Sequence, residues 1–311
     1  MTLDAPALEL KSAMKGFPET DGGFAEVLTD INLRVSPGEI LAIVGYSGSG
    51  KTTLINLLAG LLKPDGGEAL AMGRPITGPS PERSVVFQNY SLLPWLTTLQ
   101  NVRLAVDEVF SSESETQKDE RARKYLDMVK LTPALGKRPS ELSGGMRQRV
   151  ALARGLSIEP DTLLLDEPLG ALDALTRGTL QQEICRICER EKRTVVLITN
   201  DVDEGILMAD RIIPLTQGPR ATLGPTFEVS LPRPRLRQEV HTDPEFRRIR
   251  KEINEFLLGE GRKASTTQVT KRFQLPDLLP EDLTVPRRWY QPKRRPRRRN
   301  ESVTERIEVN A

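Results

Sequence analysis

Apolar positions in the first half of the chain follow a strand pattern and then a helical one. Residues 8–10 and 31–35 alternate between apolar and polar, and 40–44 is a continuous apolar run. These patterns predict strands within 7–44, the last of them buried. Beyond a glycine-rich turn, leucine and isoleucine recur every three or four residues, which predicts a helix that ends near 63–67. Residues 91–155 are mostly helical in pattern around a polar connection at 112–119.

The second half of the chain returns to alternating strands and helices. Apolar strands are expected at 162–165 and 194–199 on either side of a helix at 174–191, an order that is typical of a parallel sheet with crossover helices. Asp243 and Pro244 predict the start of a last, amphipathic helix, and Gly259 predicts its end. The expected organisation is a main domain over 1–240 with a helical part at about 91–155, an amphipathic helix over 241–261, and a polar, basic, disordered tail over 262–311.

Composition and charge narrow the class of protein. The net charge is +2, but residues 287–299 hold eight basic residues and no acidic one, so the rest of the chain is net acidic. No apolar run reaches the ~18–20 residues that span a bilayer, and the N-terminus predicts no signal peptide. Cys185 and Cys188 make no disulfide framework, and as a pair within a predicted helix they are expected to be structural. We therefore expect a cytosolic protein with only peripheral membrane contact.

The segment Gly45-x4-Gly50-Lys51-Thr52 predicts a phosphate-binding loop. It follows a buried strand and opens a helix, which is the context that this motif requires. Glycines let successive backbone N–H groups turn toward an anion, and the helix N-terminus adds partial positive charge. Lys51 is expected to reach the terminal phosphates, and the Thr52 hydroxyl to bind magnesium. A glycine-rich turn without a ligand is the alternative, which both flanking elements disfavour. The residues expected to hold the nucleotide are Gly45, Tyr46, Ser47, Gly48, Ser49, Gly50, Lys51, Thr52 and Thr53.

Two carboxylates follow the apolar run 163–165. Asp166 should end the strand, where a hard oxygen ligand suits Mg²⁺, and Glu167 can polarise an attacking water near the terminal phosphate. Alone, the pair would be interpreted as the start of a helix. Beside a phosphate loop, metal binding and water activation are the favoured roles.

Residues 142–149, Leu-Ser-Gly-Gly-Met-Arg-Gln-Arg, stand between these two segments. In order and spacing, the three motifs resemble those of the ATP-binding-cassette (ABC) ATPases, and the resemblance covers about residues 7–215. It implies an α/β fold, a P-loop NTPase (RecA-like) core with an N-terminal antiparallel β subdomain and an inserted α-helical subdomain. It also implies ATP hydrolysis, with ATP and Mg²⁺ as cofactors.

The resemblance assigns further residues to the site. Gln88 would contact the magnesium and the water, and Ser143, Gly144 and Gly145 would hold a phosphate of ATP bound by the other subunit of a head-to-tail dimer. The loop 170–173 would cross that dimer interface.

Two positions depart from the family pattern or fit it loosely. Phe17, with Phe24 as second choice, would stack on adenine, and core packing is the alternative for both. Where the family has a histidine after the last core strand, this chain has Asn200. An amide can still donate a hydrogen bond to a phosphate oxygen, but it carries no charge. Whether this replacement impairs hydrolysis is left open.

Segments 88–97, 199–211, 218–224 and 232–235 resemble importer ATPases of the nitrate, taurine and aliphatic sulfonate group, most of all the nitrate/nitrite branch. The expected function is to energise an ABC importer for nitrate, nitrite or a related small anion. The alternatives are a taurine or sulfonate importer, or a soluble ABC ATPase acting on nucleic acid. The family's soluble members carry a second cassette or long coiled coils, which this chain lacks.

The partners that the resemblance implies are a second copy or a paralogous ATPase, integral-membrane permease subunits, and indirectly a periplasmic or lipid-anchored solute-binding protein. The chain would then lie at the cytoplasmic face of the inner membrane. Leu93, Trp95 and Leu96 would either contact the permease or pack in the core. The basic run 287–299 leaves three interpretations open: a solvated extension, which we favour, nucleic-acid contact, and contact with anionic lipid head groups.

Overall fold

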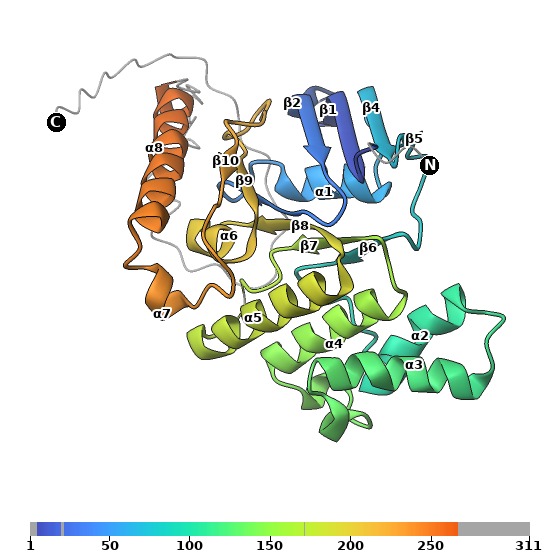
Figure 1. Ribbon diagram of the computed structural model, residues 1–311. Helices are drawn as coiled ribbons and strands as arrows, with labels where there is room; N and C mark the ends of the chain where they lie inside the picture. The colour runs from blue at the N-terminus through green and yellow to red at the C-terminus, as the bar shows by residue number, and fades with distance from the viewer. Residues whose placement is uncertain (1–4, 20–21, 171, 267–311) are drawn as a thin grey trace, which may run out of the picture. The chain divides into compact units, whose positions relative to one another are not determined.

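The computed structural model describes residues 5–19, 22–170 and 172–266 (Figure 1). Their strands are β1 (Leu8–Pro18), β2 (Phe24–Val35), β3 (Ile40–Val44), β4 (Gly66–Ala71), β5 (Arg74–Pro75), β6 (Arg83–Val86), β7 (Thr162–Asp166), β8 (Thr194–Thr199), β9 (Arg211–Pro214) and β10 (Phe227–Glu228). Their α-helices are α1 (Lys51–Ala59), α2 (Thr98–Val109), α3 (Glu115–Met128), α4 (Gly144–Ser157), α5 (Ala174–Glu191), α6 (Val202–Met208), α7 (Arg237–Val240) and α8 (Pro244–Thr266). Short 3-10 turns lie at Thr132–Ala134 and Pro139–Glu141. None of these helices is long and apolar enough to cross a bilayer.

Two sheets organise these residues. The larger sheet has the order β10-β9-β3-β8-β7-β6, in which the five strands from β9 to β6 run parallel and β10 pairs antiparallel with β9. The smaller sheet is antiparallel, in the order β2-β1-β4-β5. In the parallel register Val44 pairs with Thr199 and Asp166 with Ile198, so β3, β7 and β8 end at one edge. The residues that follow these three strands are therefore brought together there.

The larger sheet has a separate apolar core on each face. Leu41 and Ile43 of β3 pack with α1 and the smaller sheet, whereas Ile40, Ala42 and Val44 pack on the side of α4, α5, α6 and α8. All five side chains are buried, because successive residues of a strand point to opposite faces. This arrangement explains the continuous apolar run, and it confirms the predicted α/β core, the antiparallel β part and the inserted helices (Figure 1).

The inserted helices α2, α3 and α4 pack on one another. Thr97 and Gln100 form a capping box at the start of α2, and Ser114 and Gln117 form one at the start of α3. The prediction of a polar connection over 112–119 is therefore wrong in its bounds, because α3 already begins at Glu115. The capping box allows the polar stretch from Glu115 onward to form the first turns of a helix.

Two predicted helix ends are also wrong. The helix after the phosphate loop ends at Ala59, where Gly60 adopts a left-handed conformation (φ 79°) and its N–H caps the last turn, and residues 66–71 form β4 instead. The last helix does not end at Gly259 but continues to Thr266. A glycine in a helix costs only about 1 kcal/mol relative to alanine, so an amphipathic helix that is packed elsewhere along its length can pass through one.

The start of α8 agrees with its sequence signal, since the N–H of Glu245 donates to Asp243 Oδ1 at 2.8 Å. Its buried side chains, Phe246, Ile249, Ile253 and Leu257, join the core on the α6 side of the sheet. Arg250 of α8 also forms an ion pair of 2.8 Å with Asp203 of α6. From residue 267 the predicted basic tail lies outside the described residues, and the division into 1–240, 241–261 and 262–311 stays a prediction.

Candidate active site

The phosphate loop joins β3 to α1 and leaves the start of α1 open. Gly48 and Gly50 have positive φ angles of 80° and 95°, and Gly50 is the N-cap of α1 without any side-chain hydrogen bond. In contrast, side chains of Thr97, Ser114 and Ser143 cap α2, α3 and α4. A Cβ added at Gly48 would meet no atom within 4 Å. The unfilled helix N-terminus and the open backbone fit an anion such as a phosphate group.

Lys51 lies behind this loop with only 4% of its surface exposed. Its ammonium Nζ donates to the carbonyl oxygens of Gly45 (3.1 Å) and Tyr46 (2.8 Å) and to Asn200 Oδ1 (2.6 Å). Burial lowers the pKa of Lys51, and the nearby carboxylates of Glu167 and Asp166 oppose that shift. The position of the lysine side chain is therefore fixed by these three hydrogen bonds within the protein.

Asp166 and Thr52 provide two neighbouring oxygens at the start of α1. Asp166 is the last residue of β7, and its Oδ1 lies 3.5 Å from the hydroxyl of Thr52. Burial raises the pKa of Asp166, and the hydrogen bond from Thr52 and the charge of Lys51 oppose this shift. A carboxylate beside a hydroxyl is a hard-oxygen donor set, which fits Mg²⁺.

Glu167 is held by three side chains. Its Oε1 accepts from Asn200 Nδ2 at 2.6 Å and its Oε2 from Gln88 Nε2 at 3.2 Å, and Lys51 Nζ lies 3.8 Å from Oε1. Its own N–H donates to the carbonyl of Ile198 on β8, and its φ is 44°. A non-glycine residue in this region is uncommon and marks a position that the surrounding structure holds in place. The carboxylate can therefore orient a water molecule at this edge of the sheet.

The structure brings Gln88, Lys51, Asp166, Glu167 and Asn200 to this one edge. It does not bring all of the predicted residues there. Ser143, Gly144 and Gly145 form the N-terminus of α4, where Ser143 Oγ accepts from the N–H of Met146 at 3.3 Å. No hydrogen bond or ion pair of the described residues joins them to the phosphate loop.

The two candidate adenine-stacking residues lie at the open end of the β1–β2 pair. Pro18 pairs with Phe24 and Phe17 with Ala25, and the phenylalanine side chains are 37% (Phe17) and 60% (Phe24) exposed. Exposure excludes core packing for both. Among the described contacts, none links either ring to the phosphate loop.

The link between Lys51 and Glu167 through Asn200 was not foreseen from the sequence. Its only sequence signal is the polar residue that directly follows the last parallel strand. A second unforeseen feature is Arg154 of α4, which donates to the carbonyls of Ser91 (2.6 Å) and Tyr90 (2.9 Å). Arg147 of the same helix lies 5.9 Å from the centre of the Tyr90 ring. The segment after Gln88 is thus tethered to the helix that carries the 142–149 motif.

Glu204 is a third unforeseen residue, in the wall of the cleft that Glu167 and Asn200 also line. It is 4% exposed, its Oε2 accepts from the Thr199 hydroxyl at 2.6 Å, and its Oε1 has no hydrogen-bond partner. Burial raises the pKa of Glu204 to about 7, and the hydrogen bond from Thr199 opposes the shift. The folded state therefore binds this proton more tightly than the unfolded chain does.

The Glu204→Gln variant is expected to flatten the pH dependence of stability. Wild-type stability should fall as pH rises from the ordinary glutamate pKa through about 7, by as much as about 3 kcal/mol, because the charged carboxylate is then buried. Urea unfolding between pH 5 and 8 measures this. The control Glu228→Gln removes an exposed carboxyl. Stability curves for wild type and Glu204→Gln that stay parallel across this range would exclude the shift.

A parallel sheet, a phosphate loop and acidic residues at the strand ends define this chain as a P-loop nucleotide-binding protein. The family model "ABC transporter" matches residues 28–170. The nitrate transport protein NasD of Klebsiella oxytoca is 45% identical over 261 residues, which are 84% of this chain and 99% of that protein. The chain therefore belongs to the ABC transporter family, among its ATP-binding cassettes.

Other relatives carry related names. The bicarbonate transport ATP-binding protein CmpC of Synechocystis sp. is 51% identical over 80% of this chain, and the nitrate import ATP-binding protein NrtC of Synechococcus elongatus is 49% identical over 78%. The chain spans only 37% of the length of each. Among solved structures, the dimeric post-hydrolysis state of the ATP-binding cassette MJ0796 bound to ADP and Pi matches with a TM-score of 0.65 and 30% identity, over 72% of this chain and 99% of that one.

Proposed function

We propose that this chain binds ATP with Mg²⁺ and hydrolyses it to energise an importer for a small anion, nitrate or nitrite. The observation that carries the ATPase proposal is the carboxylate of Glu167, held by Gln88 and Asn200 beside the buried Lys51. Lys51 and the N–H groups at the start of α1 would bind the terminal phosphates, and Thr52 and Asp166 would hold the metal ion. The bound Mg²⁺ would neutralise phosphate charge. Glu167 would orient the water and accept its proton.

A second chain completes the site in this proposal. Ser143 and the first N–H groups of α4 would hold a phosphate of ATP bound by the other subunit, and Phe17 would stack on the adenine. The match to a dimeric cassette supports this arrangement. A homodimer and a pair with a paralogue both fit, since CmpC and CmpD of Synechocystis sp. are both relatives of this chain.

The permease contact is proposed for the segment after Gln88. Trp95 is 66% exposed, so core packing does not account for it, whereas Leu93 and Leu96 are half-buried. A large exposed aromatic is a favourable anchor for a protein interface. The complex would place this chain at the cytoplasmic face of the inner membrane, with a solute-binding protein on the other side.

Transport by the reconstituted complex tests the substrate. The chain, its permease subunits and the solute-binding protein are placed in liposomes, and ATP-driven uptake of nitrate, nitrite, bicarbonate and taurine is compared. Nitrate or nitrite should be taken up and should stimulate hydrolysis. Bicarbonate is the second candidate, because CmpC at 51% identity is named for it. Uptake of bicarbonate or taurine alone would overturn the nitrate proposal, and hydrolysis without uptake of any would overturn the importer role.

A further inference from the structure

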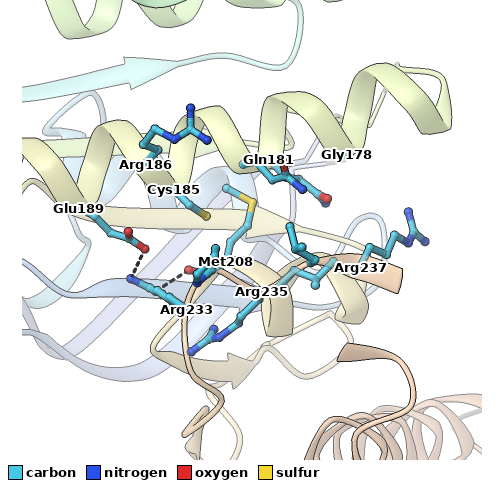
Figure 2. Close-up of a pocket in the computed structure, with 13 residues that line it drawn as sticks. Gly178, Gln181, Cys185, Arg186, Glu189, Met208, Arg233, Arg235 and Arg237 are labelled. Carbon is cyan, nitrogen blue, oxygen red and sulfur yellow. Dashed lines mark hydrogen bonds and ion pairs between the residues drawn. The ribbon is translucent and has the colours of Figure 1, made fainter. Parts of the chain in front are cut away.

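A small pocket lies between α5, the end of α6 and the segment that leads into α7 (Figure 2). Its volume is about 200 Å³. Cys185, Leu207, Met208 and Leu236 give it largely apolar walls. It is separate from the candidate active site, whose cleft is lined by other residues.

The groups around this pocket carry an excess of positive charge. Four arginines line it, Arg186, Arg233, Arg235 and Arg237, against one carboxylate, Glu189. Arg233 is neutralised, because it forms ion pairs with Glu189 (3.2 Å) and with Asp210 outside the lining (2.8 Å). The other three arginines have no ion pair among the described residues.

Arg235 is a buried, fixed cation. Its guanidinium donates only to backbone carbonyls, those of Leu231, Ile206, Ala209 and Val229. Burial, and to a smaller extent the neighbouring Arg233, lowers its pKa to about 10, so it stays charged at neutral pH. Carbonyl dipoles hold this charge in place, but they do not cancel it.

Further polar side chains line the pocket, among them those of Gln181, Arg186 and Arg237. No hydrogen bond of the Gln181 amide is found among the described residues. Arg186 comes from α5 and Arg237 from the start of α7, and both side chains extend outward from the edge of the pocket (Figure 2). Arg237 has a hydrogen bond to His241, which is not acidic.

We propose that this pocket binds a small carboxylate with an apolar body. A cavity of about 150 Å³ accommodates benzene, so 200 Å³ accommodates a ring or branched chain with one carboxylate. The apolar body would pack against Leu207, Met208 and Leu236. The carboxylate would accept from the Gln181 amide and pair with Arg186 or Arg237 at the rim.

Such a ligand would contact both helices that flank the candidate active site. α5 follows the loop 170–173, and α6 begins two residues after Asn200. Arg177 of α5 also pairs with Asp201, the N-cap of α6, at 3.7 Å. An occupant that changes the spacing of α5 and α6 would therefore act on Asn200, which makes the pocket a candidate regulatory site.

Benzoate is the probe, and benzyl alcohol is its uncharged counterpart. Calorimetry and ligand-observed NMR on the full chain should detect saturable benzoate binding with a Kd of about 1 mM or tighter, and binding of benzyl alcohol at least roughly tenfold weaker. Equal binding of the two compounds, or no saturable benzoate binding up to about 20 mM, would overturn the proposal.

Three variants locate the bound probe. Gly178 lines the pocket and a Cβ there would meet no atom within 4 Å, so Gly178→Leu should fill the space without loss of stability and abolish binding. Gln181→Leu removes the amide, and Arg186→Gln removes a rim charge. Each should weaken benzoate binding roughly three- to tenfold.

Arg190→Gln is the matched control, because it removes an arginine of the same helix that does not line this pocket. It should leave benzoate affinity unchanged. Thermal unfolding shows that each variant is folded. If folded Gly178→Leu still binds benzoate, or Arg190→Gln weakens binding as much as Arg186→Gln does, the probe binds elsewhere and the proposal is wrong.

Discussion

Glu167→Gln is expected to bind ATP with unchanged affinity and to hydrolyse it at least ~100-fold more slowly. A neutral amide cannot accept the proton of the attacking water. The exchange is nearly isosteric, and Gln88 can rotate its own amide to keep its contact with residue 167, which it now makes at 3.2 Å. The trapped nucleotide should also hold two chains together. Turnover in the permease-bound protein and light scattering with ATP measure the two effects.

A conservative change at the opposite end of β7 serves as the control for Glu167→Gln. Asp161→Asn alters an exposed carboxylate just before β7 and should leave turnover unchanged. Normal turnover of Glu167→Gln in the assembled complex would exclude Glu167 as the group that activates water.

Asn200→Ala is expected to lower turnover roughly ten- to a hundredfold and to reduce nucleotide affinity less. The amide accepts from Lys51 at 2.6 Å and donates to Glu167 at 2.6 Å, so alanine removes a partner from both at once. Asn200→His should keep or raise turnover, because the resemblance to ABC ATPases implies a histidine at this position. Hydrolysis by the isolated chain and by the complex measures both variants.

The composition of the dimer decides how an unaffected Asn200→Ala variant is interpreted. In a dimer with a histidine-bearing paralogue, the Asn200 site would be the slower of two, and its loss would change total turnover little. Cross-linking and mass measurement establish which dimer is present. Unchanged turnover in a demonstrated homodimer would exclude Asn200 as a phosphate sensor.

The parts of the fold that the sequence predicts well are those in which local pattern and packing agree. The strand at 194–199 and the helix at 174–191 appear with the predicted bounds, because each buries a continuous apolar surface on the central sheet. The helix ends were less predictable, since Gly60 ends a helix whereas Gly259 does not. Both are glycines, and only the packing around them distinguishes the two outcomes.

The candidate site could be predicted where its residues share a motif, and not where they meet through the sheet. Lys51 and Thr52 lie within one recognisable segment. The contacts of Asn200 with Lys51 and Glu167 form because β3, β7 and β8 end at one edge of the sheet. The local sequence pattern does not predict this strand order. The same holds for Arg154, whose partners Tyr90 and Ser91 are more than sixty residues away in the chain.

The Arg154 contacts have a mechanical consequence. The guanidinium of Arg154 donates to two successive carbonyls, those of Tyr90 and Ser91. Both of these residues have positive φ angles, of 64° and 45°. The segment that leads to exposed Trp95 is therefore attached to α4 through these two hydrogen bonds. In the proposed permease complex, a displacement of this segment would be passed through Arg154 to α4, whose N-cap is Ser143, and along the chain to Gln88.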